Sequence, residues 1–330
     1  MPANLPPQYS KAEEAFRQAA TPALRLEALR AMFRLLPKHK GTEKLQAELK
    51  QKISRAKEEI EGAKAPGKAT GVSHRVAREG AGQVALVGPP NAGKSALLAA
   101  LTAAQPEVAA YPFTTRAPQP GMMAWEDVAV QLVDLPAIAP EFLEPWVPGL
   151  VRAADAALLV VDLADDDLID AAEAVLARLS QAHTELVRRR PDDDDDEAVQ
   201  QVPTAVVAQK ADAPGAAGRL EVLRESWGGR FGIVATSAIA GTGLDAARRV
   251  SYDLLGLMRV YTKVPGKPAD RAHPFTLPIG GTVLDLARQV HHDFEQGLKY
   301  ARVWGSGAFD GQVVRRDHEL HDADVIELHL

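Results

Sequence analysis

The chain has 330 residues, no cysteine, 46% hydrophobic residues and a net charge of −6. Its length predicts two or three domains, and the missing cysteines exclude disulfides, thiol catalysis and thiolate metal sites. No apolar run reaches the roughly eighteen residues of a membrane span. Met1–Leu5 lacks the charged and apolar regions of a secretory signal, so we expect a cytoplasmic protein without a membrane partner.

Residues 1–80, the first of three predicted segments, carry an excess of positive charge. They contain 16 Lys and Arg against 9 Asp and Glu, a balance of +7, whereas residues 81–330 contain 22 against 35, a balance of −13. Apolar residues recur at helical spacing along Leu45–Ile60, so we expect a basic helical segment. Such an arm favours a polyanionic partner such as RNA. The alternative is a solvated helical surface with interleaved Lys and Glu.

Residues 81–258 alternate strand and helix patterns. Helices are expected over Asp170–Arg189 and Leu244–Leu257. The candidate strands are Val84–Gly88, Val128–Asp134, Ala157–Asp162, Thr204–Lys210 and Ile233–Ser237. Several of these strands are continuous apolar runs, which is typical of strands buried on both faces of a parallel sheet. The pattern predicts a doubly wound α/β domain with a mainly parallel sheet.

Residues 259–330 have the pattern of a small β domain with one helix. Pro274–Pro278 is expected to be an edge strand, and Thr282 is expected to cap a helix that runs through Phe294. Two extended stretches follow, Ala301–Trp304 and Val325–Leu328. This order predicts a β-grasp-like domain.

A complete G-x-x-x-x-G-K-S sequence joins the first predicted strand to an apolar helix. Its residues are Gly88, Pro89, Pro90, Asn91, Ala92, Gly93, Lys94 and Ser95. A glycine loop between a strand and a helix N-terminus directs backbone N–H groups at phosphates. Lys94 would reach the β- and γ-phosphates, and the Ser95 hydroxyl would bind Mg²⁺. The sequence therefore predicts a nucleoside triphosphate site.

Two segments further along the chain fit the metal and the γ-phosphate. Thr114 and Thr115 follow the first helix, where a threonine can close over Mg²⁺ and the γ-phosphate. Asp134 ends a predicted strand and would hold Mg²⁺ through a water molecule. Ala137 stands where GTPases usually have glycine; it keeps the backbone N–H but restricts the backbone, so nucleotide-driven switching is in doubt.

Two later strand ends would contact the base. The first strand end has the run Gln209, Lys210, Ala211, Asp212. The Asp212 carboxylate could accept from the ring N–H and the amine of guanine, a donor pair that adenine lacks. GTP is therefore expected rather than ATP. Gln209 is one methylene longer than the usual asparagine, which predicts reduced affinity. The backbone N–H groups of Ser237, Ala238 and Ile239 would lie near the guanine carbonyl.

These motifs, with Leu36–Lys44, Lys299–Ser306 and Asp317–Ile326, make the chain resemble the Obg-related GTPases. Within that group it is most similar to the developmentally regulated GTP-binding (DRG) proteins, which end in a TGS domain. The resemblance implies a GTPase that acts on ribosomes, translation or RNA, with no DNA partner. It implies that Ser95 and Thr115 are Mg²⁺ ligands and that Asp212 reads guanine. Ala137, Gln209 and a short stretch after Ala137 depart from the family pattern.

The hydrolytic step has two open questions. Ile138 stands where Ras-like enzymes carry a glutamine that orients the attacking water, so hydrolysis is expected to be slow or organised otherwise. Asn91 is a candidate K⁺ ligand by resemblance to potassium-activated GTPases, and the alternative is that it only accommodates the loop turn. The competing functions are a guanine-nucleotide-binding scaffold with little hydrolysis, and a protein with altered base choice.

Overall fold

The computed structural model describes residues 76–102, 117–190, 199–306 and 309–330, and in the N-terminal segment Phe16, Ala28, Leu29, 31–33, Leu35, Leu49, Lys52 and Ile53. The chain separates into two compact units, Met1–Ser73 and His74–Leu330. In the first unit the described residues are helical, and Leu29, Met32 and Leu49 are buried together. At the end of the predicted basic helical segment, residues 76–80 are not helical, and Gly80 forms a bridge with Val130. The other residues of that segment lie outside the described residues.

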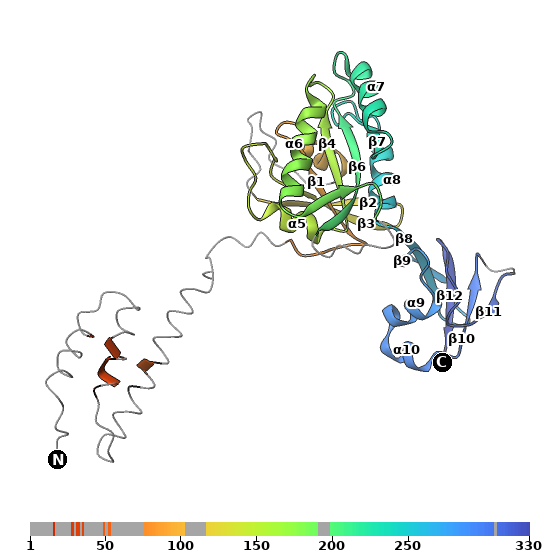
Figure 1. Cartoon of the computed structure of the whole chain (residues 1–330). Helices are drawn as coiled ribbons and strands as arrows, with labels where there is room; N and C mark the ends of the chain where they lie inside the picture. Colours follow the sequence, from red (N-terminus) through yellow and green to blue (C-terminus); the bar gives the residue numbers. More distant parts are fainter. Residues whose placement is uncertain are drawn as a thin grey trace, which may run out of the picture. The chain divides into compact units, whose positions relative to one another are not determined.

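A seven-stranded, mostly parallel sheet forms the centre of the second unit (Figure 1). Its strands are β1 (Gln83–Val87), β2 (Gln119–Trp125), β3 (Val128–Asp134), β4 (Ala156–Asp162), β5 (Thr184–Val187), β6 (Gln200–Gln209) and β7 (Gly232–Ala235). Their order is β2-β3-β1-β4-β6, with β5 and β7 sharing the outer edge of β6. Only the β2–β3 pair is antiparallel. The predicted mainly parallel α/β fold is confirmed.

Helices cover both faces of this sheet. They are α4 (Lys94–Leu101), α5 (Val147–Ala153), α6 (Leu168–Gln181), α7 (Ala216–Trp227) and α8 (Leu244–Asp253). Apolar side chains of α5, α6 and α7 pack on one face, and those of α4 and α8 pack on the other. The carboxyl ends of the parallel strands share one edge, where ligands bind in folds of this type. No helix in the described ranges has the length and apolarity that a bilayer crossing needs.

Two predicted helices in this domain were too long. The helix expected over Asp170–Arg189 ends at Gln181, because His183 adopts a φ of 55° and Thr184–Val187 pairs with Gln200–Pro203 as β5. Thr184 and Leu186 are buried while Glu185 is exposed, so successive side chains of β5 point alternately to the core and to solvent, as in any strand with one buried face. The helix expected over Leu244–Leu257 ends at Asp253. The sequence pattern did not predict β2, α5 or α7.

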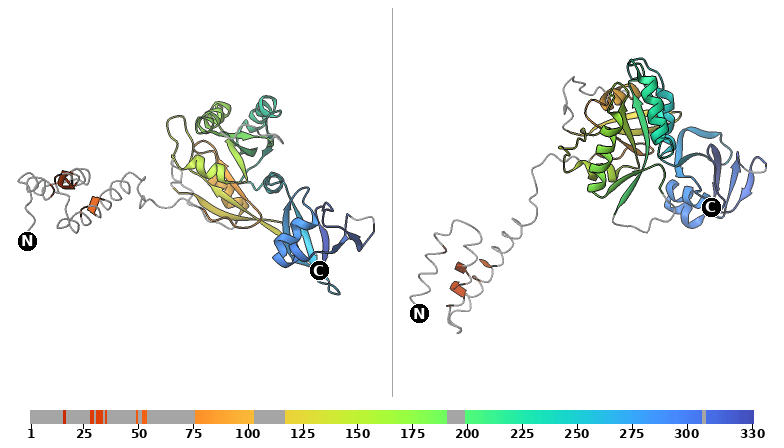
Figure 2. Two further views of the ribbon diagram at one scale, coloured as in Figure 1. Left: turned by 60° about the horizontal axis from the view of Figure 1, so that its bottom comes forward. Right: turned by 45° about the horizontal axis from the view of Figure 1, so that its top comes forward.

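A second, five-stranded sheet follows. Its strands are β8 (Leu257–Lys263), β9 (Ala269–Pro278), β10 (Tyr300–Trp304), β11 (Gln312–Val314) and β12 (Asp324–His329), in the order β11-β10-β12-β8-β9. The central β12–β8 pair is parallel and the other pairs are antiparallel. Helix α9 (Val283–Val290) packs on this sheet, with α10 (His292–Gly297) beside α9 (Figure 2). This is the predicted β-grasp-like arrangement with β9 at an edge.

Thr282 begins α9 as predicted. Its hydroxyl accepts from the N–H of Asp285, whose carboxylate accepts in return from the Thr282 N–H, a reciprocal cap. The single helix expected through Phe294 is wrong, because His291 is extended, with a φ of −171°, and α10 starts anew at His292.

Arg259 of β8 joins the two sheets. Its guanidinium donates to Glu126 and Asp127 in the β2–β3 turn and to both oxygens of Asp322, with Nη1 2.9 Å from Asp127 and Nη2 2.7 Å from Asp322. The Tyr261 hydroxyl also donates to Asp127. The Arg259 side chain is only 13% exposed. Its bond to Asp322 is the main reason that the pKa of Arg259 is raised, so this cation stays charged in place.

We expect Arg259→Met to lower the free energy of unfolding by about 1–3 kcal/mol, because three carboxylates then lose a mostly buried cation. Urea unfolding measures the change. Arg249→Met is the matched control, since its pair with Asp253 is 3.6 Å long and both side chains are more than half exposed. Equal stability of the two variants would contradict the prediction.

Candidate functional site

The glycine loop lies where predicted, between β1 and α4. A Cβ on Gly88 would lie 2.3 Å from the carbonyl oxygen of Val160 in β4, so only glycine fits this close approach. Asn91 has a φ of 61°, a left-handed conformation that asparagine tolerates better than most residues. Helix α4 starts at Lys94, directly after the loop. Its first N–H groups and positive end suit a phosphate group.

Lys94 is held inside the loop. Its Nζ donates to the carbonyl oxygens of Gly88 at 3.1 Å and Pro89 at 3.0 Å. The residue is 7% exposed. Burial lowers the pKa of Lys94 to about 8, although the nearby Asp134 carboxylate opposes this shift. A phosphate placed at this ammonium group would raise the pKa again.

Ser95 and Asp134 form the second part of the site. Asp134 ends β3, which pairs with β1, and it is fully buried. The Ser95 hydroxyl donates to Asp134 Oδ2 at 2.5 Å. A hydroxyl and a carboxylate at a phosphate loop are hard oxygen ligands of the kind Mg²⁺ prefers, usually alongside phosphate oxygens and water. The residues present therefore fit this ion.

The segment after β3 is attached to the glycine loop. The Ile138 N–H donates to the carbonyl oxygen of Gly88 at 3.1 Å, and the Ile138 side chain is fully buried in the core. Ala137, beside it, is 8% exposed. A core side chain cannot orient a water molecule at a phosphate, which agrees with the reading of Ile138 from the sequence. Thr114 and Thr115 lie outside the described residues.

Gln209, at the end of β6, connects three parts of the site. It is 1% exposed. Its Oε1 accepts from the N–H of Lys210 at 3.1 Å and from the N–H of Ala238 at 3.2 Å. Its aliphatic part packs against the glycine loop, because a Cβ on Gly93 would lie 3.5 Å from Gln209 Cγ. The two base-side loops and the phosphate loop therefore meet at this side chain.

Asp212 and the loop after β7 lie next to each other. The Ala211 N–H donates to the Thr236 carbonyl oxygen at 3.0 Å, which joins the two loops. Asp212 is exposed, and no hydrogen bond or ion pair links its carboxylate to another residue in the described ranges. Ser237 is buried, whereas Ile239 is 90% exposed. The Asp212 carboxylate can therefore receive donors from a base.

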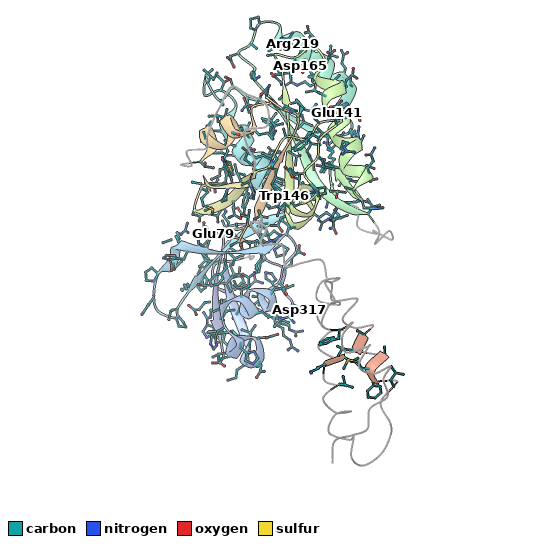
Figure 3. The ribbon with its side chains drawn as sticks, turned by 90° about the vertical axis from the view of Figure 1, so that its left-hand side faces the viewer. Glu79, Glu141, Trp146, Asp165, Arg219 and Asp317 are labelled. Carbon is teal, nitrogen blue, oxygen red and sulfur yellow. The ribbon has the colours of Figure 1, made fainter. Side chains whose placement is uncertain are left out.

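Two ion-pairing residues outside the sequence motifs, Asp162 and Arg219, support these loops. Asp162, at the end of β4, accepts from Lys210 Nζ at 2.5 Å. Arg219 of α7 (labelled in Figure 3) donates to the Leu163 carbonyl oxygen at 2.6 Å and also to that of Pro214, and it pairs with Asp166 at 2.8 Å. Neither residue belongs to a short motif, so the sequence carries no local signal for them.

Comparisons with known proteins agree with this site. A family model described as "50S ribosome-binding GTPase" matches residues 83–190, and the TGS domain model matches residues 258–330. The chain therefore contains a P-loop GTPase domain followed by a C-terminal TGS domain.

Its relatives are named as GTP-binding proteins and match over most of its length. An uncharacterized GTP-binding protein of Methanocaldococcus jannaschii is 29% identical over 88% of each chain. "Developmentally-regulated G-protein 2" of Arabidopsis thaliana is 27% identical, over 92% of this chain and 90% of its own. The relationship to DRG proteins that the motifs indicated is confirmed. Among solved structures, a GTP-binding protein from Pyrococcus horikoshii matches 75% of this chain and 99% of its own at 19% identity, with a TM-score of 0.48.

We expect GDP binding to take up close to one proton at pH 8.8 and almost none at pH 7.0. Lys94 has a pKa of about 8, and a bound phosphate raises it, so affinity falls by up to about tenfold per pH unit above 8. Calorimetry in buffers of different ionisation enthalpy counts the protons. Lys94→Arg is the control, because guanidinium stays charged throughout this range. A proton count of zero at pH 8.8 would contradict the expectation.

Proposed function

We propose that the chain is a slow, Mg²⁺-dependent GTPase that acts with a ribosomal or RNA partner. The observation that carries this proposal is the meeting of the glycine loop, the Ser95–Asp134 pair and the two base-side loops at one sheet edge. Each loop follows a parallel strand, so the sheet itself positions them. The match of residues 83–190 to a GTPase family model and the relatives named as GTP-binding proteins support the choice of a guanine nucleotide.

In this proposal each group has one role. The backbone N–H groups of Asn91–Ser95 and the Lys94 ammonium hold the phosphates of GTP or GDP, since Pro89 and Pro90 have no N–H to donate. Ser95 binds Mg²⁺ directly, Asp134 through a water molecule, and Thr115 supplies a further ligand. Bound Mg²⁺ neutralises charge on the phosphate oxygens. Asp212 accepts from the two guanine donors.

Slow hydrolysis follows from the segment after β3. Ile138 fills the core and its N–H is bonded to Gly88, so position 138 supplies no polar side chain to orient water. The same attachment, with Ala137 beside it, favours the alternative of a nucleotide-binding scaffold with little hydrolysis. For Asn91, the φ of 61° supports the turn role. The proposed K⁺ role requires its exposed side chain as a ligand.

The TGS domain offers a feature suited to a phosphate-rich partner. A cavity of about 400 Å³ is lined by Lys263, Lys267, Arg271 and Trp304, among others. Lys263 already pairs with Glu327 at 3.2 Å. Lys267 and Arg271 form no ion pair with another described residue, so their charge can meet phosphates. The family description and this cavity together support a ribosomal or RNA partner.

Single-turnover GTP hydrolysis, with and without purified ribosomes and in KCl or NaCl, tests the proposal. We expect slow turnover alone and faster turnover with ribosomes. A greater rate in KCl that Asn91→Ala abolishes would support the K⁺ role, and equal rates in both salts would exclude it. If GTP binds but stays intact under every condition, the protein is a scaffold.

We expect Asp212→Asn to weaken GDP binding by about 100-fold or more and to favour xanthosine diphosphate. The amide of asparagine can accept from the xanthine ring N–H and donate to its 2-oxo group, whereas it leaves one guanine donor unpaired. Competition titration with a fluorescent nucleotide gives both affinities. The exposed Asp165 on a neighbouring loop provides the control variant, Asp165→Asn. An unchanged base preference in Asp212→Asn would refute guanine reading by Asp212. The same conclusion would follow if ADP displaced the fluorescent nucleotide from the unaltered chain as well as GDP does.

A further inference from the structure

The carboxamide of Gln209 accepts a hydrogen bond from the Ala238 N–H, a donor that a bound guanine would also need. Two backbone N–H groups point at Oε1, those of Lys210 and Ala238, and these donors establish which end of the amide is the oxygen. The Ala238 N–H is one of the groups that we propose to lie near the guanine carbonyl. A single N–H shared between two acceptors bonds each of them less well.

The length of the side chain makes this contact reachable. Gln209 lies against the glycine loop at Gly93, so its first carbons are fixed by packing. From there the carboxamide spans from β6 to the loop after β7 and bonds at 3.2 Å. Asparagine has one methylene fewer, and from the same backbone position it cannot keep both N–H contacts.

The other end of the carboxamide is a buried donor. Gln209 Nε2 has no hydrogen-bond partner among the described residues. A buried, unpaired amide costs free energy unless an acceptor arrives. The acceptors on the imidazole edge of a purine include N7, which guanine and adenine share, so a contact there adds affinity without discriminating between them.

From these contacts we infer that Gln209 is a specificity-determining residue of the base site. Its carboxamide competes with the base carbonyl for the Ala238 N–H and so weakens reading of position 6 of the purine. Discrimination then depends mainly on Asp212, which reads the ring N–H and the 2-amino group. This inference rests on the proposed guanine-nucleotide site and concerns how that site selects its base.

The test compares GDP with 6-thioguanosine diphosphate, which keeps both donors read by Asp212 but replaces the carbonyl oxygen by sulfur, a weaker acceptor. For the unaltered chain we expect the two dissociation constants to agree within about threefold. In Gln209→Asn the Ala238 N–H is released, so GDP should bind about three- to tenfold more tightly and the ratio of the two constants should rise to about tenfold.

Gln209→Ala provides a second test, because it also releases the Ala238 N–H. It should raise the ratio of the two dissociation constants even if the lost packing weakens the binding of both nucleotides. The matched control is Gln131→Asn, another buried glutamine, whose Oε1 accepts from Gln83 at 2.7 Å within the sheet. It should leave the ratio unchanged. If Gln209 were merely structural, its substitution would weaken binding of GDP and of 6-thioguanosine diphosphate equally. An unchanged ratio of the two dissociation constants in both Gln209 variants therefore overturns the inference. Failure of the unaltered chain to bind GDP at all would instead overturn the proposed function.

Discussion

The carbonyl group of Gly88 is the point on which the site depends. It accepts from Lys94 Nζ and from the Ile138 N–H, both at 3.1 Å, and its residue lies too close to Val160 to carry a side chain. One oxygen therefore joins the phosphate loop, the buried ammonium group and the segment after β3. Because those parts belong to β1, α4 and β3, the parallel pairing of β1 with β3 and β4 is what brings them within reach.

Strand β3 extends between the glycine-loop edge of the sheet and the opposite edge, where the TGS domain makes contact. It ends at Asp134, beside Ser95, and starts next to the turn whose Asp127 accepts from Arg259 and Tyr261. The strand pairs with β1 on one side and β2 on the other. Asp134 and the turn that contacts the TGS sheet thus lie at the two ends of one strand.

Features encoded in short stretches of sequence could be predicted, and features made by distant residues could not. The glycine loop, Asp134 and Asp212 each follow an apolar run, and the Thr282 cap is a pattern within four residues. Strand β2 contains Gln119, Pro120 and Gly121, which hide its strand character, and β5 becomes a strand only because β6 offers an edge. Arg259 meets Asp127 across 132 positions of sequence, so no local pattern could indicate that contact.

Gln209 shows why a departure from a motif needs the surrounding structure before it can be interpreted. From the sequence, the extra methylene predicted only weaker nucleotide binding. In the folded chain the same methylene lets the amide oxygen take the Ala238 N–H while the carbon chain packs on Gly93. The substitution therefore stabilises the loops of the site and competes with the ligand for one donor. A side chain that both supports a site and competes within it can change the order of preference among bases without abolishing binding, because the loops keep their positions while one contact is weakened.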